Sequence, residues 1–98
     1  MSIYVDSEAP WGGSATFKSP KSCHMASDDY SPEGIEAFHR FAESIGLKRV
    51  WYQQHAIMPH YDLFPSKRIL AVKRGAIVVR TDQMIERCSI RRLADEHS

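Results

Sequence analysis

The sequence lacks any hydrophobic run long enough to cross a membrane. A spanning helix needs about 20 consecutive apolar residues, and the aliphatic runs here are only a few residues long. The first ten residues carry no basic region followed by an apolar run, so we expect no signal peptide. Cysteine is also scarce, and Cys23 and Cys88 form no CxxC pair. Without an export signal, these features predict reduced thiols in a cytoplasmic protein.

Length and motif content exclude several classes of enzyme. With 98 residues, 43% of them hydrophobic, and a net charge of +1, the chain predicts one globular domain over residues 1–98. Two domains would need roughly 100 residues each. A core this small leaves no room for a large cofactor such as a dinucleotide. The sequence also contains no Walker loop, no GxGxxG motif and no nucleophilic serine or cysteine motif.

Charge is distributed unevenly along the chain. Residues 1–39 carry a net charge of −4, residues 40–80 carry +6, and the remainder carries −1. A basic middle region favours a partner that bears phosphate groups. The alternative interpretation is a set of solvated helix surfaces with no partner.

Sequence patterns predict alternating strands and helices. Strands are expected at 2–5, 48–53 and 76–80, and helices at 31–46, 66–75 and from residue 81 onward. Ser31 provides an N-cap, Pro32 suits the first helical position, and Gly46 suits a helix end. Residues 7–31 and 54–65 are expected as loops, and the length of 7–31 makes it a candidate functional segment. Strands separated by helices predict an α/β sandwich of two or three layers, with a short, mainly parallel sheet of about three strands. The apolar residues 76–80 suit a central strand.

Asp6, His60 and Asp62 are expected to lie at one edge of this sheet. Asp6 follows the first strand, and open α/β sheets bind ligands beyond the carboxyl ends of their strands. His60 and Asp62 follow the second expected strand, and alternate residues of extended backbone point the same way. A turn capped by Asp6, and a local hydrogen bond within His60-Tyr61-Asp62, are the structural alternatives.

Two further histidines are candidates for the same site. His39 falls at the border of the buried stripe of the first helix, so its ring faces either the sheet edge or the packed interior. His24 lies beside Cys23, and adjacent residues seldom ligate one ion together, so at most one of them is expected to bind metal. Imidazole with carboxylate suits Zn²⁺ or Mn²⁺ more than Ca²⁺. Without a metal, the same groups suit general acid/base chemistry.

An ordered series of residues along most of the chain resembles a family of bacteria and their phages, domain of unknown function 4031. The residues that carry the resemblance are Tyr4-Val5-Asp6, His24-Met25, His39, Phe41-Ala42, Ile45-Gly46-Leu47, Tyr52-Gln53, His60-Tyr61-Asp62-Leu63, Ser66, Arg68, Ala71, Gly75-Ala76 and Val78 or Val79. The resemblance implies a cytosolic prokaryotic or phage protein, and it implies no activity. This chain differs from the family pattern in a longer segment between Gln53 and His60.

Together these observations favour a metal-dependent hydrolase that acts on phosphoesters of nucleotides or nucleic acid. In this hypothesis a divalent ion, Zn²⁺ or Mn²⁺, supplies the cofactor. The assigned metal ligands are Asp6, His24 and Asp62, the assigned catalytic residues are His39 and His60, and the assigned phosphate-binding residue is Arg68.

Two alternatives fit the same sequence. The first is a non-catalytic accessory module that binds nucleic acid or a protein partner through the basic region 40–80, with the histidines and Asp6 as a structural network. The second is a homodimer that packs through Ile85 and Cys88. Both an enzyme and a binding module therefore fit the sequence.

Overall fold

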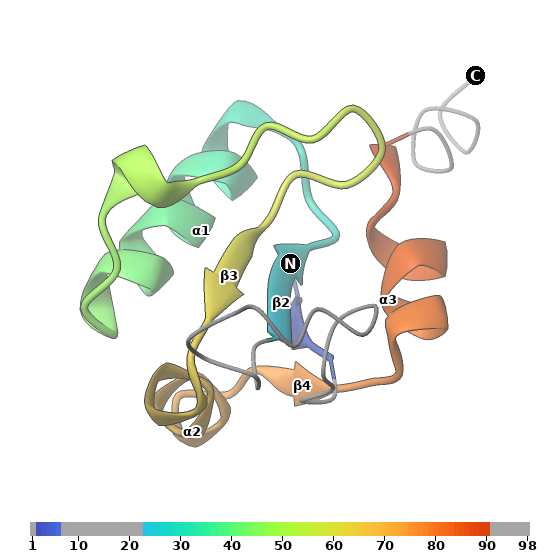
Figure 1. The fold of residues 1–98 in the computed structure, drawn as a ribbon. Coiled ribbons are helices and arrows are strands. Elements are labelled where there is room, and N and C mark those ends of the chain that lie inside the picture. The colour runs from blue at the N-terminus through green and yellow to red at the C-terminus, as the bar shows by residue number, and fades with distance from the viewer. Residues whose placement is uncertain (1, 7–22, 91–98) are drawn as a thin grey trace, which may run out of the picture.

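The structure, a computed structural model, describes residues 2–6 and 23–90. These residues form a small α/β fold in which helices cover both faces of a four-stranded sheet (Figure 1). Most of the loop expected at 7–31, and the end of the expected last helix, lie outside the described residues. The elements in chain order are β1 (Ile3–Val5), β2 (Cys23–Ser27), α1 (Pro32–Ser44), the 3-10 helix η2 (Arg49–Trp51), β3 (Tyr61–Leu63), α2 (Pro65–Lys73), β4 (Ile77–Val78) and α3 (Thr81–Cys88).

The sheet has the strand order β3-β2-β1-β4 and is mixed. Strand β2 runs antiparallel to both β1 and β3, and only β4 is parallel to β1. The expected sheet of about three mainly parallel strands is therefore wrong in both number and direction. The error arises because antiparallel neighbours need no crossover helix between them, and β2 lies inside the segment that the sequence pattern assigned to a loop.

Helix α1 follows the predicted capping pattern. The Ser31 side chain accepts a hydrogen bond from the main-chain N–H of Gly34 at 3.0 Å, and Pro32 begins the helix. Phe38 and Ala42 turn inward and are buried. The chain leaves the helix through Gly46, whose φ of +91° requires a residue without a Cβ.

Two segments of the middle region differ from the prediction. Residues 48–53 were expected as a strand, but η2 occupies 49–51, with Val50 84% exposed and Trp51 50% exposed. Strand β3 lies instead in the expected loop 54–65. Tyr61 and Leu63 are buried while Asp62 between them is exposed, which is the alternation of a half-buried strand. Although residues 48–53 have the composition of a strand, they therefore form an exposed segment and not a core strand.

Strand β4 is the opposite edge of the sheet and not a central strand. Ile77 and Val78 are both exposed there, although their apolar character suggested burial on two faces. Among the described residues, only β1 pairs with β4. The short strand continues into α3, which crosses to the other face of the sheet.

The two faces of the sheet support separate cores. One core combines β-strand residues with α1 and α2, including Val5, Met25 and Ala71. The other combines Tyr4 and Ala26 with residues of α3, and Figure 1 shows α3 on the side of the strands away from α1. Cys23 and Cys88 are buried thiols, one in each core. Within the described part of the chain, no helix is long and apolar enough to cross a membrane.

Candidate metal centre

Three neighbouring strands place a row of polar residues on one face of the sheet. His24 of β2 pairs with Asp62 of β3. On the other side of His24, the register that pairs Val5 with Met25 brings Asp6 next to His24, and the Asp6 main-chain N–H donates to the His24 carbonyl at 3.2 Å. Directly opposed residues of antiparallel strands share a face, so Asp6, His24 and Asp62 form one row across the sheet.

Asp6 forms the buried end of this row. Its Oδ1 accepts the main-chain N–H of His24 at 2.7 Å, and its Oδ2 accepts the hydroxyl of Thr81 at 2.9 Å. Oδ2 also lies 2.9 Å from Nδ1 of His24. Because a carboxylate only accepts hydrogen bonds, the contact assigns the proton of a neutral His24 ring to Nδ1. Nε2 is then the nitrogen that carries the lone pair.

His60 immediately precedes β3 and is buried. Its Nδ1 lies 2.8 Å from the carbonyl oxygen of Met58, which also only accepts, so Nδ1 carries the proton here as well. The other nitrogen, Nε2, lies 3.4 Å from Oδ1 of Asp62. A lone pair on Nε2 would repel the carboxylate oxygen unless a proton or a cation lies between them. The approach of His60 Nε2 to Asp62 Oδ1 therefore favours a proton or a cation between the two atoms.

His24, His60 and Asp62 together form a group of metal-ligand character. One ligand atom from each residue lies within 4.8 Å of the others, and the two imidazole rings meet edge to face at 4.6 Å. In a tetrahedral zinc site with bonds of about 2.0–2.1 Å, neighbouring ligand atoms are roughly 3.3 Å apart. The 3.4 Å between His60 and Asp62 matches this spacing. The other separations within the group are at most 4.8 Å.

The charges of the site shift two pKa values in opposite directions. Burial lowers the pKa of His60, but the hydrogen bond to Asp62, the Met58 carbonyl and the charges of Asp62 and Asp6 together raise it by more. The pKa of Asp62 is lowered, first by its hydrogen bond with His60 and also by Gln53, against the opposing effect of burial. The site therefore favours a carboxylate facing a positive charge.

Gln53 orients Asp62 from the neighbouring segment. Its Nε2 donates to Oδ2 of Asp62 at 2.5 Å. Gln53 and His60 also exchange two main-chain hydrogen bonds, of 2.9 and 3.0 Å, in an isolated antiparallel bridge. This bridge closes the base of the segment 54–59, so the extra length of that segment leaves the approach of His60 to Asp62 intact.

Arg68 of α2 lies beside the Asp6 end of the row. It is partly buried, and its Nε donates to the main-chain carbonyl of Asp6 at 3.1 Å. The contact brings a cationic guanidinium next to the strand end that carries the row.

His39 lies on the opposite face of the sheet. Its Nδ1 is 2.6 Å from the hydroxyl of Tyr61, and its ring meets that of Tyr52 edge to face at 4.7 Å. Tyr61 and Asp62 are consecutive in β3 and therefore point to opposite faces. Burial, and then the charge of Arg49, lower the pKa of His39. The structure thus brings Asp6, His24, His60 and Asp62 together, places Arg68 against the main chain of Asp6, and leaves His39 apart from them.

Two residues of the site were not assigned to it from the sequence. Thr81 was expected only as the start of the last helix, but Arg80 occupies the cap position and the Thr81 hydroxyl donates to Asp6. No sequence signal distinguishes such a threonine from a capping one. Gln53 was only one member of the family pattern, and its position shortly before His-x-Asp is the signal that would have identified it.

Comparison with known proteins gives one match. A family model described as "Protein of unknown function (DUF4031)" matches residues 3–91. No curated protein and no solved structure matches the chain.

Proposed function

Since the chain belongs to the DUF4031 family of proteins of unknown function, we propose its function from the site itself: it binds a divalent transition metal through His24, His60 and Asp62. The observation that carries the proposal is the 3.4 Å approach of His60 Nε2 to a carboxylate oxygen, with the ring proton already committed to Met58 on the far side. The His24 ring is held in the matching tautomer by Asp6. In this proposal Asp6 is a positioning residue and not a ligand.

The donor set favours zinc, with manganese as the second choice. Two imidazoles and one carboxylate are a common protein ligand set of catalytic zinc sites, which keep a further position open for water or substrate. Manganese binds better where carboxylate and water outnumber imidazole. A metal bound here would lower the pKa of its water ligand and polarise a phosphoryl oxygen.

From this site we infer hydrolysis of a phosphoester as the reaction. Arg68 would pair with the phosphate at the Asp6 end of the row. Gln53 would hold the Asp62 carboxylate in place, and Asp6 would keep the His24 ring oriented. His60, assigned from the sequence as a catalytic residue, then serves as a metal ligand. His39 takes no part, because its ring is bonded to Tyr61 on the other face.

A nucleic-acid-binding surface made of the whole basic region 40–80 has less support. Arg40 and Arg49 bond to acidic residues of α1, and Arg80 bonds to Asp82. Local pairing of this kind reduces the charge available to a phosphate backbone.

Isothermal titration of the metal-free protein with Zn²⁺ and Mn²⁺ tests the metal site. We expect one zinc ion per chain, a weaker manganese signal, and loss of zinc binding in His60→Gln and Asp62→Asn. His39→Gln is the matched control and should bind zinc as the wild type does. Absence of zinc binding by the wild type would contradict the proposal. Hydrolysis of bis(p-nitrophenyl) phosphate by the zinc-loaded protein, absent in His60→Gln, tests the inferred reaction.

A further inference from the structure

A groove of about 500 Å³ opens directly beside the candidate metal centre. Gln53 and Asp62 line the groove and also belong to the metal centre. The volume lies within the range of about 300–1,000 Å³ that is usual for small-molecule sites. A molecule in this groove would therefore lie next to the proposed metal.

The wall of the groove offers planar apolar surface. Trp51 and Phe64 line it and are 50% and 60% exposed, and Val50 and Leu47 add aliphatic surface. Large apolar side chains gathered in one exposed hollow indicate a binding surface more often than scattered ones do. The wall suits a flat aromatic group, which stacks on such rings.

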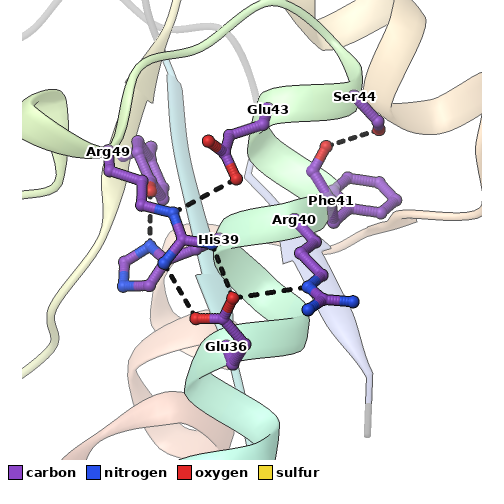
Figure 2. A network of polar contacts seen from close by, with 8 residues as sticks. Glu36, His39, Arg40, Phe41, Glu43, Ser44 and Arg49 are labelled. Atoms are coloured by element: carbon purple, nitrogen blue, oxygen red, sulfur yellow. Dashed lines mark hydrogen bonds and ion pairs between the residues drawn. The ribbon is translucent and has the colours of Figure 1, made fainter.

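The aromatic wall is fixed to the rest of the fold. Trp51 ends η2, and Arg49 at the start of η2 bonds to α1 (Figure 2). The two terminal nitrogens of Arg49 donate to the Glu36 carboxylate at 2.7 and 2.8 Å, and the Nε of Arg49 donates to Glu43 at 3.1 Å. Such bidentate contacts restrict geometry. The Arg49 contacts therefore hold η2, and with it Trp51, in place against α1.

Positive charge accompanies this wall. The Lys48 ammonium lies 5.7 Å from the centre of the Trp51 ring, and Lys67 lines the groove. Asp62, the proposed metal ligand, is the one acidic residue in the lining. An occupant that carries negative charge is favoured over a neutral or cationic one.

We propose that this groove binds a nucleotide, with the base stacked on Trp51 and the phosphate directed toward Lys67 and the metal centre. The proposed position of the phosphate rests on the proposed metal function. The proposed position of the base, which we call the base end of the assignment, rests on the aromatic wall alone. A base that carries a phosphate occurs both as a free mononucleotide and at the end of a single-stranded nucleic acid. The assignment thus names the substrate class of the inferred hydrolysis.

Isothermal titration of the zinc-loaded protein with adenosine 5′-monophosphate tests this assignment. We expect saturable binding, weakened about 5- to 100-fold in Trp51→Leu because the stacking contact is lost. Trp51→Phe should restore most of the affinity. The control variant Ile85→Leu changes an apolar residue of α3 outside the groove and should leave the affinity unchanged. Adenosine, which lacks the phosphate, should bind more weakly than the monophosphate. A hexadeoxyadenylate that binds more tightly than the monophosphate would identify a strand end as the source, and equal or weaker binding would identify the free nucleotide.

Three results would overturn the assignment. The first is no binding of the monophosphate to protein that does bind zinc, which would leave the metal proposal intact. The second is equal affinity for adenosine and its monophosphate. The third is a concentration-dependent dimer that Trp51→Leu dissociates in sedimentation velocity, since the groove would then be a contact between two copies. If zinc fails to bind but the monophosphate binds through Trp51, the metal proposal is wrong and the base end of the assignment stands.

Discussion

Asp6 contacts His24 at two points: Oδ1 accepts the main-chain N–H at 2.7 Å, and Oδ2 lies 2.9 Å from the ring nitrogen Nδ1. The two contacts fix both the strand and the ring of the same residue. Carboxylates that hold a metal-binding histidine in this way set its tautomer and raise the basicity of the nitrogen that binds the metal. Asp6, at the buried end of the row, therefore fixes the orientation and tautomer of the His24 ring.

Replacing Asp6 with alanine should destabilise the fold. Asp6→Ala removes the buried acceptor of the His24 main-chain N–H and of the Thr81 hydroxyl, and each lost acceptor costs roughly 1–3 kcal/mol. We expect the free energy of unfolding in urea to fall by about 3 kcal/mol. Asp82→Ala is the control, because Asp82 is exposed and such surface changes stay within about 0.5 kcal/mol. Equal stability of the two variants would show that the Asp6 contacts do not support the fold.

Replacing Asp6 with asparagine should weaken zinc binding more than it weakens the fold. Asp6→Asn keeps the size of the side chain but offers one acceptor oxygen in place of two. The ring of His24 then loses its charged partner, and we expect zinc affinity to fall about 10- to 100-fold in a competition titration with a chromophoric chelator. Unchanged affinity in Asp6→Asn would argue against the positioning role.

The hydroxyl of Thr81 couples the start of α3 to the site. Thr81→Val keeps the shape but removes the donor to Asp6, so we expect a loss of about 1 kcal/mol of stability and a melting temperature lower by roughly 4–8 °C. Thr81→Ser keeps the donor and should retain most of that stability. If valine and serine lower the melting temperature equally, the effect comes from packing and not from the hydrogen bond.

Much of α1 could be predicted because its signals are local. Ser31, Pro32 and Gly46 each act within one turn of the helix, and their positions matched the prediction. The sheet could not be predicted in the same way. Strand β2 is defined by pairing with β1 and β3, and its sequence CHMAS carries little strand propensity of its own. Long-range pairing therefore decided the topology.

The proximity of the candidate residues was predicted better than the sheet that carries them. Asp6, His24, His60 and Asp62 were identified from residue type and spacing, although the expected parallel strands were wrong. These residues lie together because the register of β2 with β1 and β3 places Asp6, His24 and Asp62 level with one another, and not because they follow the ends of parallel strands. His39 could not be separated from the others, since the helix pattern leaves a border residue free to face either way.

Zinc should stabilise the protein less as the pH falls. The raised pKa of His60 means that its ring holds a proton to higher pH than an ordinary histidine, and zinc must displace that proton. In the metal-free protein the sign is opposite. A raised pKa contributes stability that is complete below the ordinary histidine value of 6.5 and is lost as the pH rises through the raised value.

The measurement is the melting temperature of zinc-loaded and metal-free protein between about pH 8 and about pH 6. We expect the difference between the two to shrink over this range as protons compete for the imidazoles. His60→Gln should show little zinc-induced difference at any of these pH values. A difference that widens toward low pH in the wild type would contradict the assignment of His60 as a ligand.

X-ray absorption at the zinc edge of the loaded protein tests the central claim most directly. The account predicts nitrogen and oxygen ligands at about 2.0–2.1 Å, with outer scattering from two imidazole rings and no sulfur. Cys23 adjoins His24 in β2 but belongs to the core on the other face of the sheet, so a sulfur ligand would mean that zinc occupies a different site. Sulfur at about 2.3 Å, or scattering from fewer than two imidazoles, would contradict the assignment of zinc to His24, His60 and Asp62.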